Sequence, residues 1–542
     1  MLKRKVGVLF CSRKTEPDQN PEIIELNDFC LSHPDIAFFD AVKEEYLRGY
    51  LLKKVRSRAE GLLILGSIDR KQMDVCLDAL ESTDIPIFAC EFINIGGLTP
   101  EKDGEQIKLL IKAYTAKILA GWEVASKAAP VSLVKMFEAI DRPAMNRRQF
   151  LRMPLKLGKY EEVPVINSQS CIAFNSSCQL CVDACPTESL VKKDGTIHIK
   201  NEKCVKCGWC SVSCPYGCIQ IPSFTVPAGL ALLQELAPGL ALNSDLSLLI
   251  SCAAGCEELS KAELGSNFIT IRVPSLASVS YLHLIKAVKA GFKRILLLCP
   301  GENCPRKVSL EKWQQMFLFV KQLLESVDSF SPLELIIIRD KSEINRQLNQ
   351  TQDNTSTFYQ PQNHAETVYT RQFDYRQDFV LSLRKLLKNR PEKNNKYYDS
   401  PLPFYRISID PERCSMCGSC WEKCPSGAIT LEKNPQGNLI RFNYVKCINC
   451  RTCMINCAEE AVSIEKVLDL ACLDKGGNEV LKMDKIIKCK GCQKPIGTRS
   501  LITKVNQDLV EKGWMNNAEK IYYCSNCQTM DIENELLNFL LP

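Results

Sequence analysis

The chain has 542 residues, more than the roughly 250–300 at which a single hydrophobic core stops growing, so the sequence predicts several domains. Its apolar share of 45% and charged share of 24% are ordinary for globular proteins and exclude a disordered chain. A net charge of +6, spread over this length, gives no indication of a nucleic-acid or membrane partner.

The 30 cysteines are concentrated, with 13 in residues 171–304 and 8 in residues 414–457. A secreted disulfide framework would favour a short chain with a signal peptide, but the basic start is followed by only about five apolar residues. No stretch reaches the roughly 18 apolar residues of a membrane span. The pair Arg147–Arg148 resembles a twin-arginine export motif, but it lies far from the N-terminus with no apolar core after it. We therefore expect metal-ligating thiolates in a reducing, cytoplasmic compartment.

Residues 1–125 alternate short apolar runs with helical patterns, which predicts a parallel α/β sheet. The expected strands cover residues 5–11, 61–67 and 85–91, and the expected helices cover residues 72–82 and 105–120. A connector follows over residues 126–165.

Residues 166–225 hold the first dense cysteine block. One run, Cys204-x2-Cys207-x2-Cys210-x3-Cys214 followed by Pro215, has bacterial ferredoxin spacing. In that pattern three thiolates face one cubane and the fourth cysteine crosses to the other cubane. The other run is irregular, because Cys171 lies four residues before the expected position, Asn175. We predict one [4Fe–4S] cluster on Cys171, Cys178, Cys181 and Cys214, and another on Cys185, Cys204, Cys207 and Cys210.

Two alternatives stay open in this block. If Cys171 does not reach its cluster, that site would hold a three-iron cluster. Cys218 lies where such modules carry a small packed residue, and we interpret it as a structural thiol.

Residues 226–340 return to the α/β rhythm, with strands expected at 246–252, 268–273, 294–299 and 333–339 and helices at 278–292 and 309–327. Two cysteine pairs, Cys252-x3-Cys256 and Cys299-x4-Cys304, each follow a predicted strand. Parallel sheets bind ligands at the carboxyl ends of their strands. Residues 341–400 form a polar linker, with a helix expected at 376–389.

Residues 401–466 contain two regular runs, Cys414-x2-Cys417-x2-Cys420-x3-Cys424 and Cys447-x2-Cys450-x2-Cys453-x3-Cys457. Pro425 follows the first run, whereas Ala458 follows the second. A pair of zinc knuckles is the alternative interpretation. The crossed assignment predicts one [4Fe–4S] cluster on Cys414, Cys417, Cys420 and Cys457, and another on Cys424, Cys447, Cys450 and Cys453.

Residues 467–542 carry Cys489-x2-Cys492 and Cys524-x2-Cys527, with 31 residues between the pairs. Two such knuckles with a β-rich insert predict a zinc ribbon that holds one zinc ion on four sulfurs. A rubredoxin-like iron site has the same ligands and is the alternative. Cys472 is left over.

Both dense blocks resemble bacterial two-cluster ferredoxins, which implies low-potential one-electron transfer. The segment from Cys252 through Cys304 resembles the delta subunit of methyl-viologen-reducing hydrogenase. That resemblance implies a [2Fe–2S] cluster on Cys252, Cys256, Cys299 and Cys304, in a protein that links a hydrogenase or formate dehydrogenase to a heterodisulfide reductase-like partner. The chain departs from the family pattern at Pro300 and Pro305, and buried structural thiols are the alternative.

Residues 1–125 loosely resemble the N-terminal domain of the flavin-containing subunit of heterodisulfide reductase. The chain has Gly66 and Ser67 where the family has cysteine, and Leu-Thr follows Gly96–Gly97 where the family continues into a cysteine. We therefore expect the cluster of that domain to be lost and Cys11, Cys30, Cys76 and Cys90 to be core thiols. No G-x-G-x-x-G follows any strand, so we expect no flavin or nicotinamide site.

The four histidines lie in no motif, and we identify no catalytic constellation. The sequence thus predicts a multidomain α/β plus α+β protein with two ferredoxin-like βαβ cluster modules, two parallel-sheet α/β domains and a C-terminal zinc ribbon. Its expected role is an electron relay in an anaerobe, and the expected partner is a flavoprotein, a hydrogenase, a formate dehydrogenase or a heterodisulfide reductase-like protein. The alternatives are a redox sensor or assembly factor, and a reductase that acts on a substrate at one cluster.

Overall fold

The computed structural model groups the chain into two units. The first contains residues 1–171, 181–191 and 197–382, and the second contains residues 172–180, 192–196 and 383–542. The structure describes residues 4–12, 21–43, 61–66, 90–94, 100–127, 163–240, 246–252, 254–256, 267–292, 294–301, 304, 306–327, 332–337, 375–387, 396–434, 436–474, 476–513 and 520–529, with isolated residues between 47 and 89.

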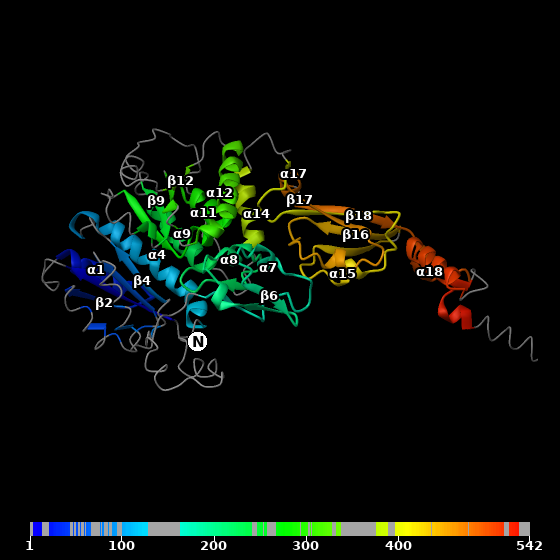
Figure 1. The fold of residues 1–542 in the computed structure, drawn as a ribbon, viewed down its shortest axis with the longest axis horizontal. Coiled ribbons are helices and arrows are strands. Elements are labelled where there is room, and N and C mark those ends of the chain that lie inside the picture. The colour runs from blue at the N-terminus through cyan, green and yellow to red at the C-terminus, as the bar shows by residue number, and fades with distance from the viewer. Residues whose placement is uncertain are drawn as a thin grey trace, which may run out of the picture. The chain divides into compact units, whose positions relative to one another are not determined.

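The first unit contains two four-stranded parallel sheets with the same strand order (Figure 1). One sheet has the order β2-β1-β3-β4 and the other has the order β10-β9-β11-β12. In each sheet, the first strand lies between the second and the third, so the order reverses beside it. Their bounds are β1 Val6–Ser12, β2 Ile36–Lys43, β3 Gly61–Gly66, β4 Cys90–Asn94, β9 Ser247–Cys252, β10 Phe268–Val273, β11 Ile295–Cys299 and β12 Leu333–Ile337.

The sequence located most of these strands to within two residues at each end. In the N-terminal sheet it missed β2 and placed the last strand at 85–91, whereas β4 covers Cys90–Asn94. The strand IAFFDAVK has no clean alternation, because β2 puts Phe38 against the bare Cα of Gly7. A Cβ on Gly7 would lie 2.4 Å from the Phe38 ring, so glycine is what allows the two strands to pair here.

Long amphipathic helices cover these sheets. Helix α4 (Pro100–Lys127) packs against α9 (Val226–Leu240), which the sequence did not predict, and the Tyr114 hydroxyl of α4 donates to the Thr270 carbonyl of β10 (3.1 Å). Helices α11 (Tyr281–Ala290), α12 (Lys307–Val327) and α14 (Tyr375–Leu387) match predicted helices. The described part also includes α1 (Pro21–Ser32) and the 3-10 turn η5 (Leu276–Ser278).

The two dense cysteine blocks share the element order β–α–β–β–α–β. In the first block these are β5 Val165–Ile166, α7 Leu180–Ala184, β6 Leu190–Lys193, β7 Thr196–Ile199, α8 Trp209–Ser213 and β8 Ile219–Gln220, with the 3-10 turn η4 at Asn201–Lys203. In the second they are β14 Tyr405–Ile409, α15 Ser419–Glu422, β15 Ile429–Asn434, β16 Gly437–Asn443, α16 Thr452–Ile455 and β17 Val462–Asp469. In both blocks the outer strands pair antiparallel and a hairpin lies between them. The parallel sheets and these repeated modules confirm a multidomain α/β chain.

Further strands extend the second module. β13 (Lys396–Tyr398) pairs with β17, and β18 (Asn478–Asp484) pairs antiparallel with β16. The tail continues with α17 (Leu470–Asp474), β19 (Ile486–Lys488), β20 (Pro495–Thr498), α18 (Arg499–Glu511) and η7 (Lys520–Tyr522). The expectation of a β-rich insert between the last two cysteine pairs is therefore wrong, because a 13-residue helix fills much of it.

Several predictions lie outside the described residues. They are most of the helix at 72–82, most of the connector at 126–165 with its arginine pair, the Gly96–Gly97 segment and most of the linker before α14. Among the helices that are described, none combines the length and the low charge that crossing a bilayer requires.

Truncation of Trp313 on α12 tests the packing of the second sheet. Trp313 is fully buried, stacks on Phe317 and donates to the Val279 carbonyl (3.0 Å). We expect Trp313→Ala to lower the free energy of unfolding of this domain by about 3–5 kcal/mol, because it leaves a cavity and an unpaired carbonyl. The urea concentration at which β9 and β11 lose hydrogen-exchange protection measures this. Leu318→Ala, at a half-exposed position of the same helix, is the control and should change little.

Candidate metal centres

Each regular cysteine run is bent by two left-handed residues that flank its second cysteine. The residue before that cysteine and the residue after it both have positive φ, and only two of the six are glycine. Left-handed backbone is unfavourable for other residues and persists only where the surroundings enforce it, often at functional sites. The pairs are Lys206 (58°) and Gly208 (81°), Met416 (58°) and Gly418 (104°), and Asn449 (57°) and Arg451 (59°).

The backbone after each fourth cysteine also has a similar shape in the four runs. Three residues after it, Glu188, Gly217, Gly427 and Glu460 all have φ between 47° and 62°. In three of the runs the next N–H then donates to the fourth cysteine's sulfur at 3.3 Å, from Ser189 to Cys185, Cys218 to Cys214 and Ala461 to Cys457. Such N–H···S bonds favour a thiolate over a thiol.

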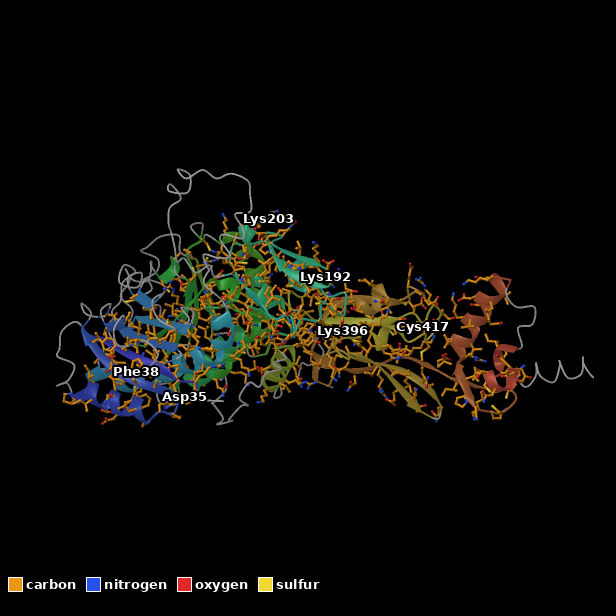
Figure 2. The ribbon with its side chains drawn as sticks, turned by 90° about the horizontal axis from the view of Figure 1, so that it is seen from below. Asp35, Phe38, Lys192, Lys203, Lys396 and Cys417 are labelled. Atoms are coloured by element: carbon orange, nitrogen blue, oxygen red, sulfur yellow. The ribbon has the colours of Figure 1, made fainter. Side chains whose placement is uncertain are left out.

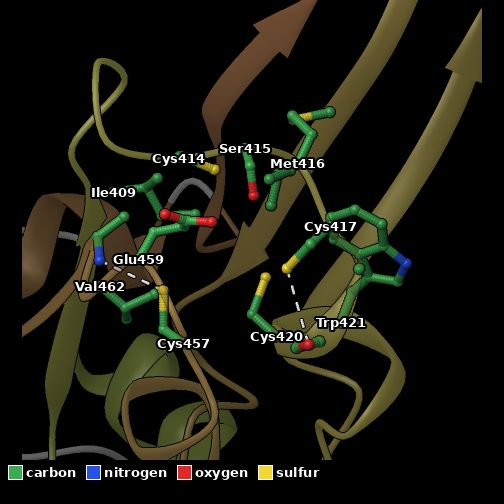
Figure 3. A pocket seen from close by; sticks show the side chains of 14 residues that line it. Ile409, Cys414, Ser415, Met416, Cys417, Cys420, Trp421, Cys457, Glu459 and Val462 are labelled. Atoms are coloured by element: carbon green, nitrogen blue, oxygen red, sulfur yellow. Dashed lines mark hydrogen bonds between the residues drawn. The ribbon is translucent and has the colours of Figure 1, made fainter. Parts of the chain in front are cut away.

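In the second module the eight cysteines line two separate cavities. One is lined by Cys414, Cys417, Cys420 and Cys457, whose sulfurs turn towards one another in Figure 3. The other is lined by Cys424, Cys447, Cys450 and Cys453. These are the two crossed groups that the spacing predicts, and ligation by them stays a prediction.

The thiols in these cavities resist ionisation on their own. Burial, reinforced by the neighbouring cysteines, raises the pKa of Cys420 to about 12 and raises the pKa of Cys453 in the same way. Like charges this close cannot all form unless a cationic core replaces the protons. Both cavities are therefore suited to a positively charged iron–sulfur core rather than to four free thiolates. Cys417, labelled in Figure 2, is exposed, so its cavity opens at the surface.

The first module repeats the arrangement with one departure. Cys185 adds to the electrostatic surroundings of Cys207 and Cys210, and burial raises the pKa of both of those thiols. Of the other predicted set, Cys171, Cys181 and Cys214 belong to the first unit, whereas Cys178 lies in residues of the second. Positive φ angles are absent from residues 171–185, all of which are described, so the irregular run does not repeat the regular bend.

Cys218 is a fifth cysteine at this site. It is buried, its thiol donates to the Ser170 carbonyl (3.0 Å), and it also lies within hydrogen-bonding reach of Cys171 and Cys214. Donation from Cys218 holds the pKa of Cys214 down at about 7, despite burial. The thiol has a defined structural partner, in keeping with its predicted role, and it also stabilises a predicted ligand.

At the second parallel sheet, three of the four predicted cysteines line one cavity. Cys252 ends β9 and Cys299 ends β11, the neighbouring strands beside which the strand order reverses, and Cys304 follows on the next loop. Such switch points are where α/β sheets bind ligands. Cys256 does not line this cavity, and burial raises its pKa to about 11.

The Cys304 sulfur is prepared to ionise. The Cys299 thiol donates to it, and the backbone N–H and charge of Arg306 add to this, so the pKa of Cys304 falls to about 6. Arg306 also lines the cavity. The cysteines of the N-terminal sheet differ: Cys11 and Cys76 lie in its hydrophobic core, Cys90 packs against that core, and burial alone raises the pKa of Cys30 to about 12.

The four tail cysteines form the tightest group. The sulfurs of Cys489, Cys492, Cys524 and Cys527 all lie within 4.8 Å of one another. The Cys492 and Cys524 sulfurs are 3.6 Å apart, close to the separation of about 3.8 Å that bonds of about 2.3 Å impose on a tetrahedral zinc site with four cysteine ligands. The Cys524 N–H donates to the buried Cys489 sulfur (3.2 Å) and helps to lower the pKa of Cys489 to about 6.

Comparison with known proteins agrees with this geometry. A 4Fe-4S dicluster domain matches residues 406–465, a 4Fe-4S binding domain matches residues 197–220, and the delta subunit of methyl-viologen-reducing hydrogenase matches residues 250–337. An uncharacterized ferredoxin of Methanocaldococcus jannaschii is 33% identical over 61 residues, which cover 79% of that protein and 11% of this chain. The chain belongs to the ferredoxin family. It is an iron–sulfur electron-transfer protein with [4Fe–4S] modules and a hydrogenase delta-subunit domain.

Other relatives are larger than the region they share with this ferredoxin. The iron-sulfur cluster-binding subunit of menaquinone reductase from Nitratidesulfovibrio vulgaris is 35% identical over 63 residues, 11% of this chain and 24% of that protein. The electron transport protein HydN of Escherichia coli is 34% identical over 41 residues, 8% of this chain and 23% of HydN. The chain thus spans about a quarter of each of these two relatives.

Two residues at these sites were not foreseen from the sequence. Arg306 lies on the loop after Cys304, and Lys482 on β18 donates to the Cys414 carbonyl (2.5 Å). Only the position of Arg306, two residues after a predicted ligand, carried a signal. Lys482 lies 25 residues beyond the last cysteine of its module, where no spacing rule applies.

Replacement of Cys171 tests the irregular run. We expect Cys171→Ser to convert one [4Fe–4S] cluster to a three-iron cluster, with loss of about one iron per chain, because the other three thiolates remain. The characteristic EPR signal of the oxidised three-iron cluster would report this. The neighbouring Cys218→Ala should keep all clusters, and an unchanged spectrum in Cys171→Ser would show that Cys171 is no ligand.

Proposed function

We propose that this ferredoxin relays low-potential electrons between partner proteins through four [4Fe–4S] clusters and one [2Fe–2S] cluster. The four cubanes are assigned to the crossed cysteine sets of the two modules. The [2Fe–2S] cluster is assigned to Cys252, Cys256, Cys299 and Cys304, and it requires Cys256 to turn towards the cavity that the other three line. Bound iron–sulfur clusters supply one-electron transfer, and the protein supplies thiolates, burial and hydrogen bonds.

The observation that carries the proposal is a junction within the first unit. The Arg306 guanidinium donates to the Val205 carbonyl (3.2 Å), between the first two cysteines of a cubane run, and to the Pro274 carbonyl (2.7 Å) at the end of β10. Gly208 in the same run packs against Ser278, where a Cβ would lie only 2.7 Å away. The loop of one predicted cubane and the cavity of Cys252, Cys299 and Cys304 therefore share a side chain. That is the arrangement a two-centre electron path needs.

One histidine has a structural role that competes with catalysis. His283 is buried, its Nδ1 accepts from the Ser280 N–H in a capping box and its Nε2 contacts the Val226 carbonyl. Burial lowers its pKa to about 4, so it is neutral near pH 7 and fully engaged. This favours a relay over substrate chemistry at that residue.

The partners follow from the resemblances. A hydrogenase delta-subunit domain supports a hydrogenase or formate dehydrogenase as one partner, and the similarity to HydN and to a component of menaquinone reductase supports a reductase-type complex. We propose a heterodisulfide reductase-like protein or another flavoprotein as the second partner. In this setting the N-terminal sheet is a docking domain without a cluster.

For the tail we propose one structural zinc ion on Cys489, Cys492, Cys524 and Cys527. The sulfur separations support it, and a closed site of four cysteine ligands has no open position for chemistry. Its role would be to fix the end of the chain beside the second module.

The metal content after anaerobic purification tests the cluster assignment. Four cubanes bring about 16 irons and the [2Fe–2S] cluster raises this to about 18, with matching sulfide. Cys304→Ser should lose about two irons and one EPR component, while the cubane signals remain. About 16 irons in the parent chain would remove the [2Fe–2S] cluster, and about 8 would favour a redox sensor over a relay.

Zinc binding should weaken in acid. Because the Cys489 pKa is near 6, this ligand is a thiolate above that pH and binds a competing proton below it. We expect the zinc affinity to fall steadily as the pH is lowered from about 7 to about 5, measured by competition with a chromogenic chelator. Cys492→Ser should release the zinc without loss of iron. Iron at this site in place of zinc would support the rubredoxin-like alternative.

A further inference from the structure

Strand β18 brings a lysine to the first cavity of the second module. It lies outside the repeated β–α–β–β–α–β unit and pairs antiparallel with β16. In that register Lys482 is opposite Ile440, which lines the cavity of Cys414, Cys417, Cys420 and Cys457. The side chain is buried, with 8% of its surface exposed.

The Lys482 ammonium is held by three acceptors. Its Nζ donates to the carbonyls of Cys414 (2.5 Å) and Pro411 (2.8 Å) and to the Ser500 hydroxyl (3.0 Å). A lysine has three N–H donors, so all of them are used and the charge has a fixed position. Two of the three acceptors belong to the loop that starts the cysteine run.

Nearby carboxylates offset this charge only in part. Among the described residues Lys482 forms no ion pair, and Asp484 reaches it indirectly, by accepting from the Ser500 N–H (2.7 Å). Glu459 lines the same cavity, but its carboxylate pairs with Lys504 (3.4 Å). The Lys482 charge also favours the ionised form of Cys414, although burial raises the pKa of that thiol overall.

We propose that Lys482 raises the reduction potential of the cluster on Cys414, Cys417, Cys420 and Cys457. A reduced cluster carries one more negative charge than an oxidised cluster, so a fixed positive charge beside it stabilises the reduced state. The proposal rests on the presence of that cluster in the proposed relay. It makes this site the more favourable electron acceptor of the two in its module.

The test is an EPR-monitored redox titration of the full chain with its clusters. Lys482→Gln removes the charge and keeps N–H donors for the loop carbonyls. At a fixed poise we expect the reduced-to-oxidised ratio of one component to fall about tenfold, which is about 59 mV for a one-electron couple. Comparison with Cys417→Ser identifies that component. Lys482→Arg, which keeps the charge, should restore the ratio, and Lys433→Gln, at an exposed position of β15, should leave it unchanged.

Two results would overturn the proposal: an unshifted potential in Lys482→Gln with full iron content, or an equal shift in Lys482→Arg. If Lys482→Gln does not retain its iron, Ser500→Asp tests the same electrostatics by placing a carboxylate against the ammonium. It should lower the same component, and the absence of a shift would contradict the proposal. The relay itself fails differently, when the clusters are present but do not exchange electrons with a partner.

Discussion

The cost of gathering thiolates is the constraint on which both ferredoxin modules depend. Four cysteines that share a cavity repel one another once ionised, and burial makes each charge less favourable still. The chain nevertheless imposes this convergence through left-handed residues on both sides of each regular run's second cysteine, four of them not glycine. A cationic cluster converts the strain and the repulsion into binding, so the folded state of these loops and the cluster stabilise each other.

The same sheet topology occurs twice in the first unit, but only one copy places cysteines at its switch point. In the second copy Cys252 and Cys299 end the two neighbouring strands beside which the order reverses. In the first copy β1 ends at Ser12 and β3 ends at Gly66, and the cysteines lie in or against the hydrophobic core. The fold is thus permissive for a cluster, and the residues at the strand ends decide whether a site can form.

Cysteine spacing predicted most of the candidate sites because ligation is a local property of the chain. The two groups of four in the second module meet as the crossing rule requires, and the strands of the second parallel sheet fall close to where apolar runs placed them. Helix α9 was missed because its Pro227, Gly229 and Pro238 suggested a broken segment, although packing on α4 stabilises it. The position of Cys256 outside its cavity likewise depends on backbone geometry that spacing does not encode.

What the spacing could not reveal is the charge that surrounds the clusters. Arg306 binds a carbonyl in a cysteine run of the first module, and Lys482 binds one in the second module. Both cations come from segments outside the repeated β–α–β–β–α–β unit, one after the delta-subunit cysteines and one on an added strand. Because a fixed charge beside a cluster changes the energy of its reduced state, domains joined to a module can adjust its potential without altering its ligands. Fusion would thus serve electron transfer in two ways, by bringing centres close together and by supplying the cations that order their potentials.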